Sequence, residues 1–327
     1  MMPLCDRFAR RISYLRISVT DRCNLRCIYC LPACGIRWLP RVEVLRFEEI
    51  LEVVRVAASL GVTHVRLTGG EPLIRDGLPD LVAMLAEVPQ LEDLSLTTNG
   101  VRLARHAQAL VRAGLRRVNI SLDTLKPERF RAITRFGSIE EVQRGIGTAL
   151  AAGLSPVKLN VVVMRGVNDD EIVDLARLAV DRPLHVRFIE LMPIGDYFTR
   201  ERLVLAEEIL ARLSVFGELQ PIHSLQGCGP AQAFKWPGAQ GTVGVIGAVT
   251  QAFCAQCNRL RLTATGQLRP CLDDTAAVDL KPALRPFVDA DQITALIQQA
   301  VRDKPERHHM AEREAGTPRL CMAGVGG

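Results

Sequence analysis

The sequence has too little of several features to belong to some large classes of protein. Aromatic residues make up only 5% of its 327 residues, which is poor material for a surface that stacks on nucleic-acid bases. It holds no run of about 18 consecutive apolar residues, so we expect no membrane span. The net charge is only +5, which suits an anionic ligand but not extensive nucleic-acid binding. The length indicates about two domains of ordinary globular composition.

We expect no secretory signal at the N-terminus, because Asp6, Arg7, Arg10 and Arg11 are charged and the segment has no apolar core. The ten cysteines are clustered, with none between Cys34 and Cys228. A secreted disulfide scaffold spreads its cysteines through a short chain. We therefore expect a protein of the reducing cytosol, where clustered cysteines bind metal or carry out redox chemistry.

Short β-branched runs alternate with helical patterns from residue 14 to about 215. The predicted strands cover residues 14–20, 64–70, 91–98, 116–123, 157–164 and 184–192. The predicted helices cover residues 47–60, 78–88, 101–113, 139–152, 170–181 and 206–213. Capping boxes are predicted at Ser138 to Glu141 and at Asn168 to Glu171. Six successive βα units predict an α/β protein with a parallel sheet, either doubly wound or an incomplete barrel.

Side-chain alternation within the strands favours the barrel. One set of positions is apolar and is expected to face helices. The other set is polar: Arg16/Ser18/Thr20, Arg66/Thr68, Ser95/Thr97/Asn99, Asn119/Ser121/Asp123, Lys158/Asn160 and His185/Arg187. An ordinary TIM barrel has an apolar interior, and parallel sheets seldom face solvent. We therefore predict an incomplete (β/α)6 TIM-type barrel that encloses a polar functional cavity, with a solvent-facing sheet as the alternative.

The alternation ends after residue 215, and residues 226–250 are rich in Gly and Pro. A further strand over residues 258–264 and a helix over residues 291–302 are predicted beyond them. We therefore divide the chain into the partial barrel, residues 1–225, and a smaller C-terminal module, residues 226–327, that closes its open side. His308-His309 is better explained as a solvated or structural tract than as a metal site.

Cys23, Cys27 and Cys30 lie directly after the first predicted strand, at the edge where parallel barrels place their active sites. Three cysteines at this spacing can hold a [4Fe–4S] cluster and leave one iron open to another ligand. A closed four-ligand site that includes Cys34 is the alternative.

Cys254, Cys257 and Cys271 form a second group of three. The same C-x2-C spacing begins zinc ribbons, so zinc with Cys228 or His223 as a fourth ligand stays open. Arg259 and Arg261 follow at once, two residues apart and therefore on one strand face. We expect no metal role for Cys5 and Cys321.

These motifs resemble those of the radical S-adenosylmethionine (SAM) superfamily. In that superfamily an aromatic residue, here Tyr29, precedes the last cysteine of C-x3-C-x2-C, and a Gly-Gly-Glu-Pro motif, here residues 69–72, follows the second strand. The run from Cys257 through Asn258, Arg259 and Leu260 to Arg261 is similar to that of the GTP-cyclising radical SAM enzymes of molybdenum cofactor biosynthesis. This resemblance covers nearly the whole chain and implies a lyase with GTP 3′,8-cyclase activity.

The resemblance implies two [4Fe–4S] clusters and SAM as cofactors. Cys23, Cys27 and Cys30 would hold the cluster that binds SAM, and Cys254, Cys257 and Cys271 the cluster that meets GTP. A 5′-deoxyadenosyl radical would take hydrogen from ribose C3′, and C3′ would bond to C8 to give (8S)-3′,8-cyclo-7,8-dihydroguanosine 5′-triphosphate. The alternatives are a peptide-modifying maturase with an auxiliary cluster, an electron-transfer iron–sulfur protein and a zinc-stabilised nucleotide-binding module.

The resemblance also implies roles for single residues. The implied GTP contacts are Arg16, Arg66, Thr97, Lys158, Arg259, Leu260 through its backbone, and Arg261. The implied SAM contacts are Tyr29, Gly70, Ser121 and Met192. Arg16 is also predicted to act catalytically, near the ribose or in the final reduction. The terminal Gly326-Gly327 pair would enter the active site, although the preceding residues 320–324 depart from the family pattern.

The implied partners are GTP as substrate, a low-potential electron donor, and cyclic pyranopterin monophosphate synthase, the next enzyme of the pathway. The sequence indicates neither nucleic acid nor a membrane as a partner. A monomer or a homodimer is expected.

Overall fold

The computed structural model describes residues 4–222, 229–313 and 322. His223, Cys228, Cys321 and the Gly326-Gly327 pair therefore lie outside the described residues, and their predicted roles are not addressed by the fold. None of the described helices has both the length and the apolar character that crossing a membrane requires.

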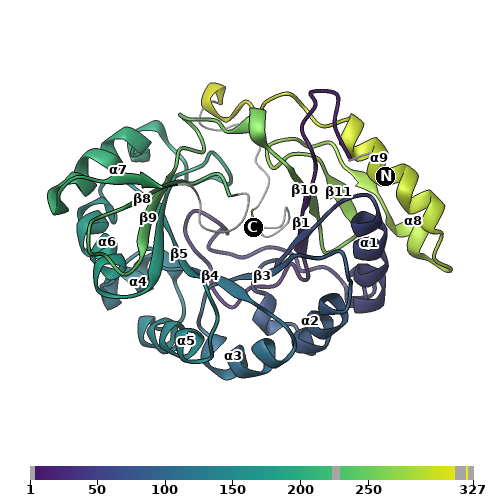
Figure 1. The fold of residues 1–327 in the computed structure, drawn as a ribbon, viewed down its shortest axis with the longest axis horizontal. Coiled ribbons are helices and arrows are strands. Elements are labelled where there is room, and N and C mark those ends of the chain that lie inside the picture. The colour runs from purple at the N-terminus through teal and green to yellow at the C-terminus, as the bar shows by residue number, and fades with distance from the viewer. Residues whose placement is uncertain (1–3, 223–228, 314–321, 323–327) are drawn as a thin grey trace.

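One sheet of twelve strands forms the frame of the molecule, in the order β12-β11-β10-β1-β2-β3-β4-β5-β6-β9-β8-β7. The strands are β1 (Tyr14–Ser18), β2 (His64–Thr68), β3 (Asp93–Thr98), β4 (Arg117–Ser121), β5 (Val157–Val163), β6 (Leu184–Glu190), β7 (Gln220–Ile222), β8 (Gln232–Lys235), β9 (Thr242–Ile246), β10 (Arg259–Leu262), β11 (Gln267–Arg269) and β12 (Val278–Asp279). From β10 through β1–β6 to β9 all neighbours pair in parallel, and the outer strands are antiparallel. Figure 1 shows these strands as an open arc.

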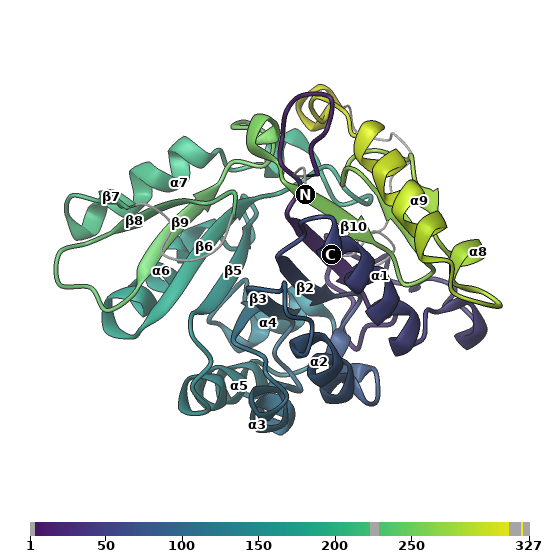
Figure 2. The ribbon, with the colours of Figure 1, turned by 45° about the vertical axis from the view of Figure 1, so that its right-hand side comes forward.

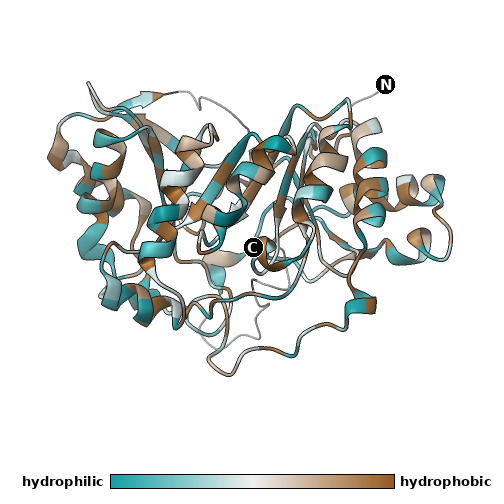
Figure 3. Ribbon diagram, turned by 90° about the horizontal axis from the view of Figure 1, so that it is seen from below, coloured by the Kyte–Doolittle hydropathy of each residue, from teal (hydrophilic) through white to brown (hydrophobic). Residues whose placement is uncertain are grey.

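The helices lie on the outer side of this arc (Figure 1). They are α1 (Phe47–Ser59), α2 (Leu78–Ala86), α3 (Leu103–Arg112), α4 (Pro127–Thr134), α5 (Ile139–Ala151), α6 (Ile172–Asp181), α7 (Ala206–Leu213), α8 (Lys281–Leu284) and α9 (Ala290–Arg302). Apolar and polar residues alternate along them, as expected of helices with one buried face (Figure 3).

The predicted incomplete barrel is confirmed, because the six predicted strands appear as β1–β6 in the predicted parallel order. The helix α4, which begins at Pro127, was not predicted. Both predicted capping boxes are wrong. Ser138 makes no side-chain cap bond, and the Asn168 side chain binds the backbone of Met164, Asp123 and Val162 instead.

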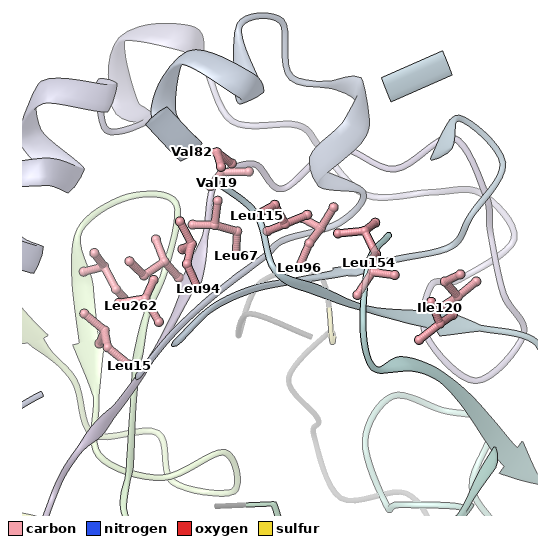
Figure 4. Close-up of a cluster of buried hydrophobic side chains, with 14 of the residues drawn as sticks. Leu15, Val19, Leu67, Val82, Leu94, Leu96, Leu115, Ile120, Leu154 and Leu262 are labelled. Atoms are coloured by element: carbon pink, nitrogen blue, oxygen red, sulfur yellow. The ribbon is translucent and has the colours of Figure 1, made fainter. Parts of the chain in front are cut away.

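The apolar strand positions pack against the helices and form the main hydrophobic core. Leu15, Leu67, Leu96 and Ile120 lie in this layer, and Figure 4 shows them on the helix-facing side of the strands. Because side chains alternate along a strand, the intervening polar residues must face the inside of the arc.

The C-terminal segment extends the sheet at both ends. β9 pairs with β6, and β10 pairs with β1, so residues beyond 226 flank the predicted six-stranded core on either side. α9 packs beside α1, as Figure 2 shows. The division at residue 225 stays a prediction.

Candidate functional site

Three adjoining cavities of about 530, 90 and 290 Å³ lie along the inner face of the sheet. Arg259 lines the first and second, and Arg187 lines the second and third. Gly229 lines all three cavities, and Pro230 lines the first and second. The polar strand positions therefore face cavities, as predicted.

Strand pairing aligns the arginines of neighbouring strands in one row across this inner face, which we call the arginine row. Arg261 of β10 is paired with Arg16 of β1, Arg16 with Arg66 of β2, and Arg66 with Ser95 of β3. Ser95 is paired in turn with Arg117 of β4. Arg117 is bound by Asp93 in a buried ion pair.

The cations in and beside this row repel one another. Burial, together with Arg261 and Arg66, lowers the pKa of Arg16 well below its usual value. Burial and Arg259 lower the pKa of Arg261 to about 10. Burial and Arg187 lower the pKa of Lys158 to about 6. A polyanion bound here would offset this repulsion through charge-assisted hydrogen bonds.

Buried polar atoms without a partner also face this region. Among the described residues, Tyr14 Oη, Thr97 Oγ1, Asn160 Oδ1 and both side-chain polar atoms of Asn119 make no hydrogen bond. Buried polar groups are nearly always paired in folded proteins. Orphaned groups on the four strands β1, β3, β4 and β5 therefore indicate a site built for a polar ligand.

The first cysteine group lies in the loop after β1 and is fixed by the loops after β2 and β3. Gly70 approaches this loop so closely that a Cβ there would lie 2.2 Å from the carbonyl oxygen of Arg22. Glu71 accepts hydrogen bonds from Leu73 N, Thr98 Oγ1 and Asn99 N at 3.0, 2.7 and 2.6 Å. The Gly-Gly-Glu-Pro motif thus ties three loops together at the carboxyl edge of the sheet.

Hydrogen-bond donors reach the sulfur of Cys23. Leu25 N lies 3.4 Å from Cys23 Sγ, and Asn99 Nδ2 lies 3.9 Å from it. Burial raises the pKa of Cys23 to about 11 and raises that of Cys27 as well. Thiolates in such a place need a positive partner, and a bound metal centre supplies one.

Tyr29 is held by an acid on the inner face of the sheet. Its hydroxyl donates to Asp123 Oδ2 at 2.7 Å, while Val162 N donates to Asp123 Oδ1 at 2.8 Å. Burial raises the pKa of Asp123 to about 6. Asp123, one of the predicted polar strand positions, therefore fixes the aromatic ring that precedes Cys30.

The second cysteine group is built around a buried lysine. Lys304 is only 2% exposed, and its Nζ donates to the carbonyl oxygens of Arg259 and Pro270 at 2.8 and 2.6 Å. Lys304 also hydrogen-bonds Cys257. Burial raises the pKa of Cys257, but Lys304 and Arg259 outweigh it, so the pKa is lowered overall.

The segment around His308 closes the other side of this group. Arg10 donates to the carbonyl oxygens of Cys254 and Pro305 at 2.9 and 2.6 Å, and His308 N lies 3.4 Å from Cys254 Sγ. The backbone of His308 thus contacts the second cysteine group. Within the described residues, no three His, Cys, Asp or Glu side chains surround a single metal ion. Each cysteine of an iron–sulfur cluster binds a different iron, so its ligands are spaced more widely.

The structure brings many of the predicted site residues together. Arg16, Arg66 and Arg259 line the central cavity, and Lys158 lines the adjoining one with Arg187. Ser121 ends β4 at the cysteine edge, and Met192 follows β6. The Leu260 side chain lies in the hydrophobic core, so only its backbone is available to a ligand.

Five further polar residues line the central cavity without having been predicted as ligand contacts: Tyr14, Arg117, Asn119, Asn160 and Arg187. All five occupy the polar alternation of their strands, which was the available signal. Cys5 and Cys34 are exposed and lie outside both groups of three.

Comparison with known proteins gives full-length relatives. The chain is 52% identical over 327 residues to a GTP 3′,8-cyclase of Heliobacterium modesticaldum, with 99% of this chain and 100% of the relative covered. It is 51% identical to a GTP 3′,8-cyclase of Pelotomaculum thermopropionicum, with 98% and 99% covered.

Solved structures show the same fold at low identity. SuiB of Streptococcus suis bound to its precursor peptide SuiA has a TM-score of 0.62 and 13% identity, with 90% of this chain and 65% of SuiB covered. Methylornithine synthase has a TM-score of 0.50 and 20% identity, with 63% of each chain covered. Such identities bear on the fold alone, so the likeness to SuiB does not favour the peptide-maturase alternative.

Family comparison divides the chain into two matched parts. Residues 17–179 match the Radical SAM superfamily, and residues 184–310 match Molybdenum Cofactor Synthesis C. The radical SAM family implies a [4Fe–4S] cluster and SAM as cofactors. Together with the relatives above, these matches show that the chain belongs to the GTP 3′,8-cyclase family of radical SAM enzymes.

Proposed function

We propose that GTP binds across the inner face of the sheet, between two cluster sites, and that the residues of this face position it for 3′,8-cyclisation. The observation that carries the proposal is the row of Arg261, Arg16 and Arg66, because it places several guanidinium groups where a triphosphate would neutralise them. GTP carries about four negative charges, and Lys158, Arg259 and Arg187 stand beside the row to share them.

The first cysteine group suits a cluster with one open iron. Cys23, Cys27 and Cys30 supply three thiolates, and backbone and amide N–H groups point at Cys23 Sγ. Tyr29 is part of this loop, Gly70 packs against it, and Ser121 and Met192 lie at the same edge of the sheet. These four residues are the proposed SAM contacts.

We assign a second [4Fe–4S] cluster to Cys254, Cys257 and Cys271. Lys304 and Arg261 place positive charge beside Cys257 and Cys271, which lowers the pKa of Cys257, while burial still raises the pKa of Cys271. Three cysteines again leave one position open, and β10 carries Arg259 and Arg261 directly away from them toward the central cavity. GTP held by these arginines would therefore lie beside the second group.

When bound, the reduced first cluster and SAM supply a 5′-deoxyadenosyl radical, the species that starts the reaction. The residues of the chain hold the substrate for that radical. Cations of the arginine row bind the triphosphate, and Thr97 and Lys158 line the wall between that row and the SAM edge. Holding reactants in a near-attack geometry contributes much of an enzyme's rate.

Arg16 is the proposed catalytic residue, since it lies on the strand that leads into the first cysteine loop and is paired with both Arg66 and Arg261. It is thus the guanidinium between the two cluster sites. The electron donor and the synthase that takes up the product are further proposed partners. They would act on a monomer or a homodimer.

The decisive experiment incubates anaerobically reconstituted, reduced protein with SAM and GTP. We expect 5′-deoxyadenosine and the 3′,8-cyclised nucleotide in comparable amounts, and about eight irons per chain. Formation of 5′-deoxyadenosine without any cyclised nucleotide contradicts the proposed site.

The variant Arg259→Ala/Arg261→Ala separates substrate binding from cluster assembly. It should lose GTP-dependent turnover and keep about eight irons per chain. A drop to about four irons would assign these arginines to the second cluster instead. Arg55→Ala/Arg302→Ala, two arginines on the outer helices α1 and α9, is the control for loss of charge alone.

A further inference from the structure

The most completely orphaned side chain of the inner face is Asn119. It is 1% exposed and lines the central cavity. In the part of the chain that the structure describes, neither its Nδ2 nor its Oδ1 has a hydrogen-bond partner. Burying an amide without hydrogen-bond partners costs desolvation free energy. We therefore expect both groups of Asn119 to be paired when a ligand is bound.

The neighbours of Asn119 locate it between two kinds of ligand contact. On β4 the inward-facing residues follow one another as Arg117, Asn119 and Ser121, spaced by about 7 Å. Ser121 lies at the edge of the cysteine loop and is a proposed SAM contact. Arg117 belongs to the arginine row where the triphosphate is proposed to bind. Asn119 is therefore at the level between SAM and the phosphates.

The adjacent strands place proposed GTP contacts at this same level. Asn119 is paired in register with Thr97 on β3 and with Lys158 on β5. The reaction itself requires a ribose here, because the carbon that loses hydrogen must lie against the 5′-carbon released from SAM. The sugar of GTP thus has to occupy the layer between the SAM contacts and the cations.

The chemistry of the side chain fits a sugar better than a phosphate. A primary amide offers two donors and one acceptor oxygen, whereas phosphate oxygens only accept. A hydroxyl group both donates and accepts, so neighbouring hydroxyls can satisfy Nδ2 and Oδ1 together. We propose that Asn119 binds the ribose hydroxyls of GTP and thereby selects a ribonucleotide and fixes its sugar. This inference rests on the proposed GTP site and adds a substrate-binding residue to it.

The first test uses the unaltered protein and three nucleotides: GTP, 2′-deoxy-GTP and 3′-deoxy-GTP. Removing a hydroxyl that Asn119 binds leaves a buried amide group unpaired, and we expect a loss of affinity of about 10- to 100-fold for at least one deoxy nucleotide. Equal affinity for all three nucleotides overturns the inference. Failure to bind GTP at all is a different result and overturns the proposed function.

The second test is a cycle with Asn119→Leu, which removes both polar groups at similar volume. We expect GTP to bind this variant about as weakly as the deoxy nucleotide binds the unaltered protein, with little further loss on removing the hydroxyl. The ratio of 5′-deoxyadenosine to cyclised nucleotide should rise, because a loosely held sugar is misplaced. Full retention of ribose discrimination by Asn119→Leu overturns the inference.

The comparison variant is Asn160→Leu, at a second asparagine that lines the same central cavity. Asn160 is the corresponding asparagine of β5, paired with Ser121 at the SAM edge. It should weaken SAM binding and keep the discrimination between GTP and the deoxy nucleotides. Iron content and SAM affinity of Asn119→Leu, both unchanged, will show that this variant is correctly folded. If Asn160→Leu abolishes ribose discrimination and Asn119→Leu does not, Asn160 binds the ribose in place of Asn119 and the inference is overturned.

Discussion

Arg16 of β1 is paired in register with Arg66 of β2, so two buried guanidinium groups project side by side into one cavity. Burial, followed by repulsion from Arg261 and Arg66, lowers the pKa of Arg16. Arg66 is further held by Ser95 Oγ and by the ring of Tyr14, 5.5 Å away. The chain thus keeps two like charges together where an anion would relieve their repulsion.

Arg66→Ala should weaken GTP binding by about 10- to 100-fold, because one charge-assisted hydrogen bond contributes about 1.5–3 kcal/mol. The unliganded variant should be as stable as the parent or more stable, since a buried like-charge contact is removed. Equilibrium dialysis with GTP and thermal unfolding without it measure the two effects. Arg55→Ala, an exposed arginine paired with Glu52, is the control.

GTP affinity should fall as pH rises. Burial and neighbouring cations lower the pKa of Lys158 to about 6, so the amine is mostly neutral at about pH 7.5 before binding. A bound triphosphate raises this pKa, so binding takes up a proton and is weakened when protons become scarce. Arg187, Arg117 and Arg66 face Lys158 with positive charge and Asp93 with negative charge. His185, with a pKa lowered to about 4 by burial, does not titrate in this range.

Calorimetry at about pH 7.5 in two buffers of different ionisation enthalpy measures this proton uptake. A terminal phosphate titrates near pH 6, so free GTP contributes little there. The observed binding enthalpy should differ between the buffers for the parent protein and much less for Lys158→Met. Equal enthalpies for the parent would mean that Lys158 is already protonated before GTP binds.

Much of the barrel could be predicted because its information is local. Each strand of β1–β6 shows its own alternation, and each following helix its own apolar stripe. The joining of β9 to β6 and of β10 to β1 was not predicted, since Leu15 and its partner Leu260 are separated by most of the chain. The short helix α4 was missed because it is mostly polar on its surface and has few apolar residues to mark it.

The site residues could be predicted where the alternation of polar and apolar residues along a strand marks them. Tyr14 and Asn119 occupy polar positions that could have been singled out, but their lack of a partner is visible only in three dimensions. Lys304 had no signal in the sequence at all. Its importance comes from Arg259 and Pro270, whose carbonyl oxygens meet it only after the chain has folded.

Lys304→Met should lower the reduction potential of the proposed second cluster. The buried ammonium stabilises negative charge at Cys257 and Cys271, and the reduced cluster is the more negative state. The two carbonyl oxygens left unpaired should also cost about 1–3 kcal/mol each in the free energy of unfolding. Lys281→Met, at a lysine paired with Glu43 on the surface, is the control. Redox titration followed by electron paramagnetic resonance should separate the two variants. Identical reduction potentials would show that Lys304 does not influence the second cluster.

Gly70→Ala should disrupt the first cysteine group and leave the second intact. The added Cβ would lie 2.2 Å from the carbonyl oxygen of Arg22, a backbone atom that cannot turn away, and Cys23 is the next residue. Reconstituted iron should fall from about eight to about four per chain, and SAM binding should be lost.

Gly147→Ala is the matched control, because no heavy atom lies within 4 Å of its added Cβ. That change lies inside α5 and should stabilise the fold by about 0.5–1 kcal/mol while iron and SAM binding stay unchanged. Full iron content and normal SAM affinity in Gly70→Ala would show that the loop after β2 does not hold the first cysteine group in place.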